Sequence, residues 1–188
     1  MFDLFKKLFI KKHKIEMGDN ILKFNENQDY KVNAFINNEF LLIETMSGLG
    51  LAKKDYDVPN QILSIDADNK SIGESILLAL SKSRTITREE YASFFNLETN
   101  KKQYEEWEKN LMQKFGYKTK KALYRKMNNC WIRLKNGTIE ISPSNHEKLK
   151  GWSGIRNADV ILSLDNSSEE IGVGLRLAFS RCIGLDEI

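Results

Sequence analysis

The chain has few of the residues that build metal centres or disulfide frameworks. Its 188 residues include only two cysteines, Cys130 and Cys182, and two histidines, His13 and His146. Neither pair has metal-site spacing, and neither histidine stands in a recognisable catalytic motif. The sequence therefore predicts no metal and no cofactor. It also predicts a reduced chain in which Cys182, on the apolar stripe of a helix, is a buried thiol.

Long apolar runs are also absent. No segment approaches the roughly 18 to 20 apolar residues of a membrane span. The N-terminus lacks the apolar core and small-residue cleavage site of a secretory signal. We therefore expect a cytoplasmic protein. A chain of 188 residues is long enough to bury a sizeable core as one domain or as two closely fused halves.

The chain does contain an internal repeat. Residues 62–81 and 161–180 align without a gap at an offset of 99 residues and are identical at nine positions. Each copy starts with a short apolar run that fits a buried strand and continues with apolar residues at helical spacing. The helix starts carry side-chain caps: Asp68 or the pair Ser71 and Glu74 in the first copy, and the capping box from Ser167 to Glu170 in the second.

Both predicted helices contain a glycine at the same position, Gly73 and Gly172. A glycine inside a helix costs about 1 kcal/mol relative to alanine. We therefore expect the helix backbone to lie close to the sheet at these positions. A phosphate-binding loop at Gly172-Val173-Gly174 is the alternative, although the full spacing of that motif is missing.

The repeat extends towards the N-terminal side of each copy. Residues 31–44 read as two strands around Asn37-Asn38, and 99 residues later two strands flank Asn136-Gly137, a strong hairpin signal. Each half is thus predicted as hairpin, long loop, strand and helix. The loops, 45–60 and 144–159, are long enough to be functional. They contain the candidate binding residues Asp55, Tyr56, Asp57 and Trp152.

The remaining segments break the repeat. Residues 1–14 predict a short basic amphipathic helix, which could lie on an anionic membrane surface or dock on its own domain. Residues 86–128 predict three helices, the first opened by a capping box at Thr87 to Glu90. We therefore divide a single domain, 1–188, into four parts: a basic N-terminal segment 1–29, a first half 30–85, a helical insertion 86–128 and a second half 129–188.

Charge is distributed unevenly along the chain. Residues 1–14 carry +4 and residues 100–135 carry +8, so the total of +3 leaves −9 for all other residues. Basic helices interleaved with aromatic residues can grip phosphate backbones. An RNA-binding protein that uses the basic insertion 100–135 is therefore one alternative for the function.

Several motifs resemble those of the CdiI immunity proteins of bacterial contact-dependent growth inhibition. The resemblance covers residues 30–182 and lies in Ser47-Gly48-Leu49-Gly50-Leu51, in the helix from Ile72-Gly73 to Ser83-Arg84, in His146-Glu147-Lys148-Leu149-Lys150-Gly151-Trp152-Ser153-Gly154, and in the segment from Ser168-Glu169-Glu170 to Arg181-Cys182. It implies a non-enzymatic cytoplasmic protein. Such a protein binds and neutralises the C-terminal toxin domain of a cognate effector, commonly a nuclease.

Together these observations predict an α+β fold with a mainly antiparallel sheet of six or seven strands. We expect a one-to-one complex with the toxin domain and no small-molecule substrate. Carboxylates can imitate nucleic acid for a nuclease. The non-repeated Asp55 and Asp57 are favoured over the repeated Asp66 and Asp165, which fit turns and caps. A hydrolase that uses His146 and Glu147 is a further alternative.

Overall fold

The computed structural model describes residues 12–17 and 20–185. Its first two strands are β1 (Lys12–Met17) and β2 (Asn20–Asn25). The first half contains β3 (Tyr30–Ile36), β4 (Leu41–Leu49), β5 (Leu51–Lys54), β6 (Gln61–Leu63) and α1 (Asn69–Lys82). The insertion contains α2 (Arg88–Phe94), α3 (Leu97–Lys114) and α4 (Lys120–Tyr124). The second half contains β7 (Asn128–Lys135), β8 (Thr138–Lys148), β9 (Gly151–Gly154), β10 (Val160–Ser163) and α5 (Ser168–Ser180).

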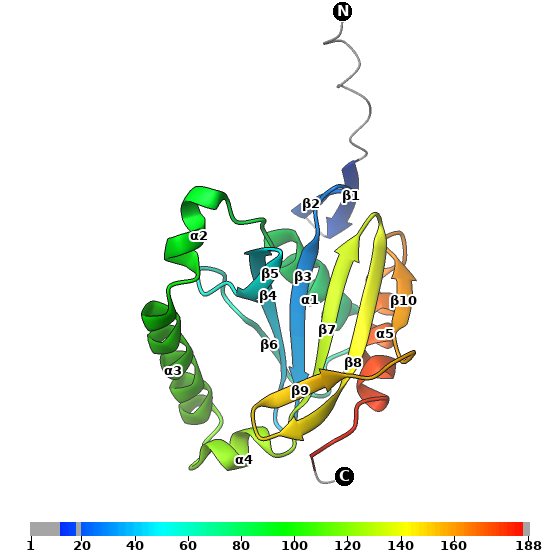
Figure 1. Cartoon of the computed structure of the whole chain (residues 1–188). Coiled ribbons are helices and arrows are strands. Elements are labelled where there is room, and N and C mark those ends of the chain that lie inside the picture. The colour runs from blue at the N-terminus through cyan, green and yellow to red at the C-terminus, as the bar shows by residue number, and fades with distance from the viewer. Residues whose placement is uncertain (1–11, 18–19, 186–188) are drawn as a thin grey trace, which may run out of the picture.

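The main sheet joins the two halves through β3 and β7. Its strand order is β10-β8-β7-β3-β4-β5, with β6 also paired to β4 and β9 also paired to β8. All of these strand pairs are antiparallel. The predicted α+β class is confirmed, and Figure 1 shows α1 and α5 together behind the sheet while α3 stands to one side. The related halves thus build one sheet around a central strand pair.

The strand count and the long loops were predicted wrongly, because the main sheet has eight strands in the described part of the chain. In the region expected to be a loop after Thr45, β4 continues to Leu49, turns at Gly50 with a φ of 78°, and returns as β5. In the second half β8 continues to Lys148 and returns as β9. Glycines that resemble loop residues are here the turns of two further hairpins.

The hairpin predicted from Asn136-Gly137 is confirmed. Both residues have positive φ, 51° and 73°, as the tight turn between β7 and β8 requires. The predicted helix caps are also present. Asp68 accepts a hydrogen bond from the Ser71 backbone N–H in α1, and Ser167 and Glu170 form the capping box of α5. Local sequence signals therefore fix these turns and helix starts.

The main core lies between the sheet and the two repeat helices. Buried residues of α1 and α5, such as Ile76 and Leu175, pack against Ile43, Ile132 and Ile141 of the strands. Neighbouring residues of β4 alternate between faces, so Leu42 belongs instead to a second cluster with Phe35 and Phe40 on the opposite side. Residues of α3 and α4 complete that cluster, which is how the insertion attaches to the sheet.

Gly73 and Gly172 lie at a contact between the helices, where the sequence predicted a contact with the sheet. A Cβ on Gly73 would lie 1.8 Å from the backbone oxygen of Ser168, and a Cβ on Gly172 would lie 1.9 Å from that of Asn69. Positions 69 and 168 are themselves related by the 99-residue offset. The first turn of each helix therefore packs directly on the backbone of the other. The phosphate-loop interpretation is wrong, because Gly172 and Gly174 are inside α5.

The N-terminal prediction is wrong where the structure describes it. Residues 12–14 were assigned to a basic helix, but they belong to β1, which pairs with β2 from Lys12 opposite Asn25 to Met17 opposite Asn20. Cross-strand hydrogen bonding to β2 therefore replaces helical hydrogen bonding over this stretch. Residues 1–11 lie outside the described part. Among the described helices, none is long and apolar enough to cross a membrane.

The cysteines also differ from the prediction. Cys182 was expected to be the buried thiol on a helix, but α5 ends at Ser180 and Cys182 is partly exposed just beyond it. Cys130, inside β7, is the fully buried one. Both cysteines are free thiols.

Glu108 connects the insertion to the second half. Its carboxylate is buried and accepts hydrogen bonds from Lys120 and from Lys150, which lies in the turn between β8 and β9. Burial raises the pKa of Glu108, but its side-chain donors, first Lys120 and Lys150, outweigh burial and leave the pKa below the ordinary value of 4.5. The carboxylate therefore stabilises the fold in its charged form.

This arrangement predicts a pH-dependent effect of Glu108→Gln. Because the pKa of Glu108 is lower in the folded protein than in the unfolded chain, its carboxylate contributes its full stability at pH values above the unfolded-state pKa of about 4.5. That contribution is lost as the pH falls from there through the folded-state pKa. We expect the variant to melt about 5 °C below the wild type at pH 7, and the gap to close towards pH 3. Glu106→Gln, an exposed carboxylate on the same helix, is the control. A gap that is independent of pH would contradict the assignment.

Candidate functional site

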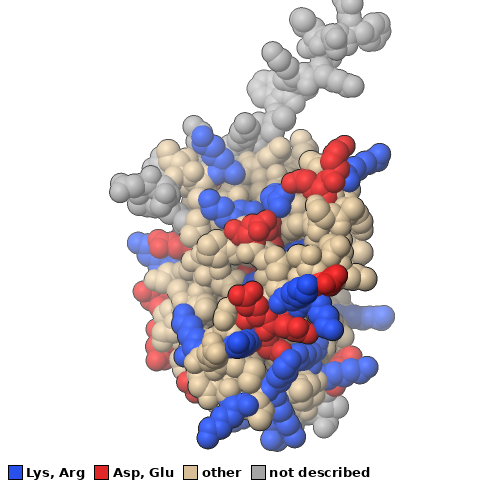
Figure 2. All heavy atoms as spheres, turned by 90° about the vertical axis from the view of Figure 1, so that its left-hand side faces the viewer, with Lys and Arg blue, Asp and Glu red and all other residues tan. Residues whose placement is uncertain are grey.

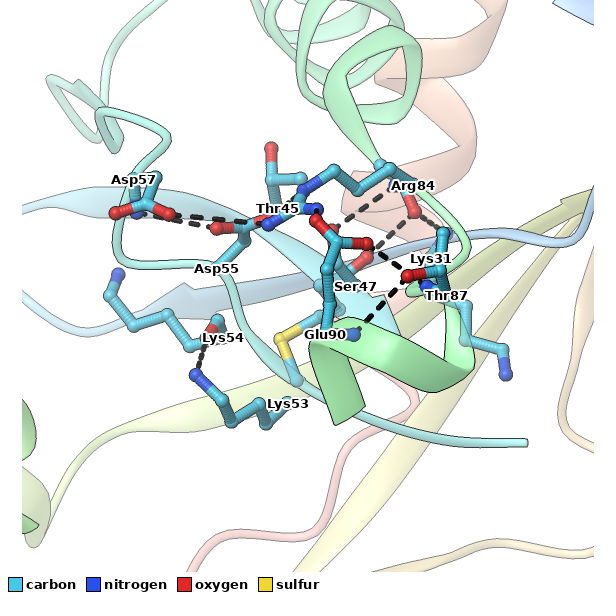
Figure 3. Close-up of polar contacts among 12 residues, drawn as sticks. Lys31, Thr45, Ser47, Lys53, Lys54, Asp55, Asp57, Arg84, Thr87 and Glu90 are labelled. Carbon is cyan, nitrogen blue, oxygen red and sulfur yellow. Dashed lines mark hydrogen bonds and ion pairs between the residues drawn. The ribbon is translucent and has the colours of Figure 1, made fainter. Parts of the chain in front are cut away.

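Three of the four candidate residues lie together in the turn that follows β5. Asp55 is 1% exposed, and its backbone N–H donates to the Thr45 carbonyl oxygen over 2.9 Å. Its carboxylate accepts the Arg84 Nε at 3.2 Å and the backbone N–H of Asp57 at 3.3 Å. Asp55 is therefore part of the turn's internal structure, and its charge is used within the molecule (Figure 3).

Arg84 collects acidic partners from two segments. Besides Asp55 it pairs with Glu90 of α2 at 2.9 Å and approaches Asp57 at 4.0 Å. Glu90 also closes the capping box with Thr87, so one carboxylate serves both the helix and the arginine. Figure 3 shows these side chains converging on the guanidinium. The start of the insertion is thereby fixed against the β5–β6 turn.

Asp57 differs from Asp55 in exposure. Its side chain is 82% exposed, and the only ion pair the structure gives it among the described residues is the 4.0 Å approach to Arg84. Tyr56, between the two aspartates, is partly buried, with the ammonium groups of Lys53 and Lys54 5.1 and 5.5 Å from its ring centroid. Burial, with the nearby Glu44 and Tyr104, raises the pKa of Tyr56 to about 12, so its hydroxyl stays neutral. The turn thus presents one largely exposed carboxylate and one neutral aromatic hydroxyl.

A buried ion pair lies beneath this turn. Glu44 of β4 is 3% exposed, and Lys54 of β5 contacts it at 2.5 Å and also donates to the side chain of Asn60. The Lys54 ammonium lies 5.3 Å from the ring centroid of Trp107 on α3. Burial raises the pKa of Glu44 and lowers that of Lys54, while each partner's charge opposes the other's shift. The pair spans adjacent strands and faces the insertion.

Two hollows open beside these residues. One of about 370 Å³ lies between the β5–β6 turn and α3, with Lys54, Tyr56 and Trp107 in its lining. Its neighbour of about 270 Å³ is lined by Asp57 and Arg84, among others. Tyr56 lines both. The turn therefore stands on a ridge between two depressions that a partner's side chains could enter.

Trp152 does not join this group. It lies on β9, where its Nε1 donates to the Met127 carbonyl oxygen at 3.1 Å and its ring meets Phe35 edge-on at 5.6 Å. The ring also stacks on His146 at 4.7 Å. Its role in partner binding stays a prediction, while these contacts give it a structural role against the second apolar cluster.

His146 and Glu147 do not form a catalytic pair. The His146 imidazole is fully buried with its Nε2 3.2 Å from the Leu149 carbonyl oxygen. The Glu147 carboxylate is exposed and accepts the Ser153 hydroxyl at 2.6 Å. Within residues 12–17 and 20–185, no cluster of three or more His, Cys, Asp or Glu side chains could hold a metal ion.

The insertion carries the positive charge that the sequence predicted, but it also carries acidic groups. Figure 2 views the side of the molecule bearing α3, and shows Asp and Glu side chains among the Lys and Arg side chains on this face. Some of these lysines are already paired, as Lys102 is with Glu98 at 2.8 Å. The surface is a mosaic of both signs, which is less suited to a phosphate backbone than an uninterrupted basic stripe.

Sequence reasoning missed Arg84, Glu90, Glu44 and Lys54 as members of the site. Arg84 and Asp55 are 29 residues apart, and no local pattern predicts that they pair. Glu44 did carry a signal, because it directly follows the apolar run Leu41-Leu42-Ile43. A charged residue beside such an apolar run is expected to be buried with it and then needs a partner.

Comparison with known proteins decides the family. The family model described as CdiI, CDI immunity protein, matches residues 30–182. The chain belongs to the CdiI immunity protein family. A similar CdiI protein is immunity protein CdiI-YPIII of Yersinia pseudotuberculosis serotype O:3 (strain YPIII), 38% identical over 164 residues, which are 79% of this chain and 93% of that protein.

Two solved structures are also similar. A protein of unknown function, NMB0488 from Neisseria meningitidis, has a TM-score of 0.82 and 46% identity over 85% of this chain and 98% of its own. The CdiA-CT/CdiI toxin and immunity complex from Yersinia pseudotuberculosis contains a chain with a TM-score of 0.76 and 33% identity, covering 82% of this chain and 98% of its own. These comparisons give no support to the RNA-binding alternative.

Proposed function

We propose that this CdiI protein binds the C-terminal toxin domain of its cognate CdiA effector in a one-to-one complex and neutralises it. The observation that carries the proposal is the similarity to a chain solved in a toxin and immunity complex. The match covers 98% of that chain and 82% of this one, which supports a common mode of action. Neutralisation by binding needs no chemistry from the immunity protein, which we propose is not an enzyme.

The partner is proposed to be a nuclease that is met in the cytoplasm. A nuclease holds phosphates with positive charge, and a binding surface with free carboxylates is attracted to it. The residues outside the two basic segments carry −9 in total, and Asp57 is an exposed member of that set. We therefore propose the β5–β6 turn, with its two adjoining hollows, as part of the toxin-binding surface. Asp55 supports it through Arg84, and Trp152 supports the β8–β9 hairpin.

Titration calorimetry of the purified protein with the purified toxin domain tests the proposal. We expect one-to-one binding with a dissociation constant of about 1 nM or below. The toxin domain alone and the same mixtures, assayed for cleavage of DNA and RNA, test the nuclease assignment separately: the free domain should cleave, and the mixtures should not. Absence of binding would overturn the proposed function. Tight binding to a toxin that cleaves neither nucleic acid would overturn the nuclease assignment alone.

Reversing the charge of Asp57 tests the proposed surface. Asp57→Lys is expected to weaken toxin binding about 10-fold, mainly through slower association, because the side chain is exposed and its loss leaves the fold intact. Asp66→Lys makes the same charge change on an exposed aspartate in the turn before α1 and is the matched control. Equal affinities for both variants would remove the β5–β6 turn from the interface. Asp55→Lys is unsuitable because it would place a lysine at a buried position and break the ion pair with Arg84.

A further inference from the structure

The two cysteines are in contact with each other in the main core, where Cys130 is buried and Cys182 packs against it. Cys130 lies on β7 and Cys182 follows the end of α5, and their sulfur atoms are 3.7 Å apart. Cys130 is fully buried, whereas Cys182 is partly exposed. The Cys182 thiol also lies 3.3 Å from the carbonyl oxygen of Asn129. The fully buried sulfur of Cys130 is therefore in contact with the sulfur of a residue that is partly open to solvent.

The corresponding position after the first repeat helix is occupied by a residue without sulfur. By the 99-residue offset, Ser83 is the counterpart of Cys182 and Lys31 is the counterpart of Cys130. The Ser83 hydroxyl donates to the Met46 carbonyl oxygen at 2.6 Å and accepts the Lys31 backbone N–H at 2.9 Å. The fold thus needs only a small polar group after each repeat helix. A pair of cysteines at these two positions is found in the second half and not in the first.

We propose that Cys130 and Cys182 form an oxidisable dithiol that a small-molecule disulfide, such as glutathione disulfide, converts into an intramolecular disulfide. The Cys182 thiolate attacks one sulfur of the reagent, a Cys182–glutathione disulfide forms, and one glutathione thiolate leaves and takes a proton from water. The Cys130 thiol then gives up its proton and attacks the Cys182 sulfur, which releases the second glutathione. Two protein thiols and one glutathione disulfide thus yield one protein disulfide and two glutathione thiols.

The environments of the two sulfurs assign these roles. The hydrogen bond from Cys130 lowers the pKa of Cys182, which favours the attacking thiolate at the partly exposed residue. Burial raises the pKa of Cys130, so this thiol does not react with external reagents in the folded state. Contact with Cys182 makes Cys130 the resolving thiol once the mixed disulfide has formed.

The bond would also fix the chain that follows α5. The Ile183 backbone N–H donates to the Ser144 carbonyl oxygen at 3.1 Å, and its carbonyl oxygen accepts the His146 N–H at 2.9 Å. This residue therefore braces β8 at the start of the β8–β9 hairpin. A disulfide between Cys130 and Cys182 would link this segment covalently to β7. It would also reduce the conformational entropy of the unfolded chain by closing a loop between positions 52 residues apart. We expect the oxidised protein to melt about 5 °C or more above the reduced protein.

Intact-mass measurement of the folded full chain after incubation with glutathione disulfide tests the proposal. The wild type should lose two hydrogen atoms, keep no adduct and yield a linked Cys130–Cys182 peptide. Cys130→Ser should retain one glutathione on Cys182, and Cys182→Ser, which restores the residue found at Ser83, should remain unmodified. A wild type that keeps the glutathione adduct, or in which both thiols survive until the protein is unfolded, would overturn the proposal. Reversal by dithiothreitol, with return of the lower Tm, completes the expected result.

Discussion

Lys54→Met is expected to lower the free energy of unfolding by about 3 to 5 kcal/mol. The methionine side chain keeps most of the lysine's length but leaves the Glu44 carboxylate buried without its 2.5 Å partner. Glu44 is 3% exposed, so its carboxylate has little contact with water to compensate for the lost interaction. Urea denaturation at pH 7, followed by circular dichroism, measures the loss.

A double variant distinguishes the cost of leaving one buried charge unpaired from the net contribution of the ion pair. Combining Lys54→Met with Glu44→Leu removes both charges, and we expect it to recover stability to within about 1 to 2 kcal/mol of the wild type. Lys102→Met is the control, because Lys102 is exposed and its pairing with Glu98 at 2.8 Å is worth little. If Lys54→Met costs no more than Lys102→Met, the Glu44–Lys54 pair is not buried in solution.

Gly172→Ala is expected to destabilise the protein by about 1 to 3 kcal/mol, although alanine is the better helix former. The new Cβ would lie 1.9 Å from the Asn69 backbone oxygen, and that oxygen cannot rotate away. The two helices must separate, which loosens the core between α1, α5 and the sheet. Thermal unfolding of the variant, compared with the wild type, measures the effect.

Gly174→Ala provides the matched control within the same helix. Its nearest neighbour would be the Leu162 Cδ1 atom at 2.6 Å, the far end of a flexible and partly exposed side chain. We expect a change of less than about 1 kcal/mol, because the leucine can move while the helix gains propensity. Equal losses for the two variants would show that the Gly172 contact with α1 is not the rigid constraint.

The Asn136-Gly137 turn and the capped helix starts, which local signals specify, were predicted correctly. Asn136-Gly137 specifies its turn by the φ values it tolerates, and Ser167 with Glu170 specifies a helix start. The contact of α1 with α5 was missed because Gly73 and Gly172 indicate that another part of the backbone lies close by, but do not show which part. The β4–β5 and β8–β9 hairpins were missed because Gly50 and Gly151 are equally typical of loops, and pairing is decided by the strand opposite.

The candidate site was predicted only in part for a similar reason. Exposed loop position led to Asp57 and Tyr56, which the structure places on a ridge between two hollows. The same reasoning chose Asp55, whose charge is committed to Arg84. Burial depends on the segments that fold over a residue. For Asp55 these include Arg84, which lies 29 residues further along the chain, so no local pattern indicates the burial.

Growth protection tests the account most directly. Bacteria that express the cognate CdiA toxin domain from one inducible promoter and this protein from another are followed by optical density and viable count. We predict that the wild-type protein restores growth against its cognate toxin and fails against a non-cognate toxin domain. Growth arrest by the cognate toxin despite abundant, folded immunity protein would contradict the proposed function.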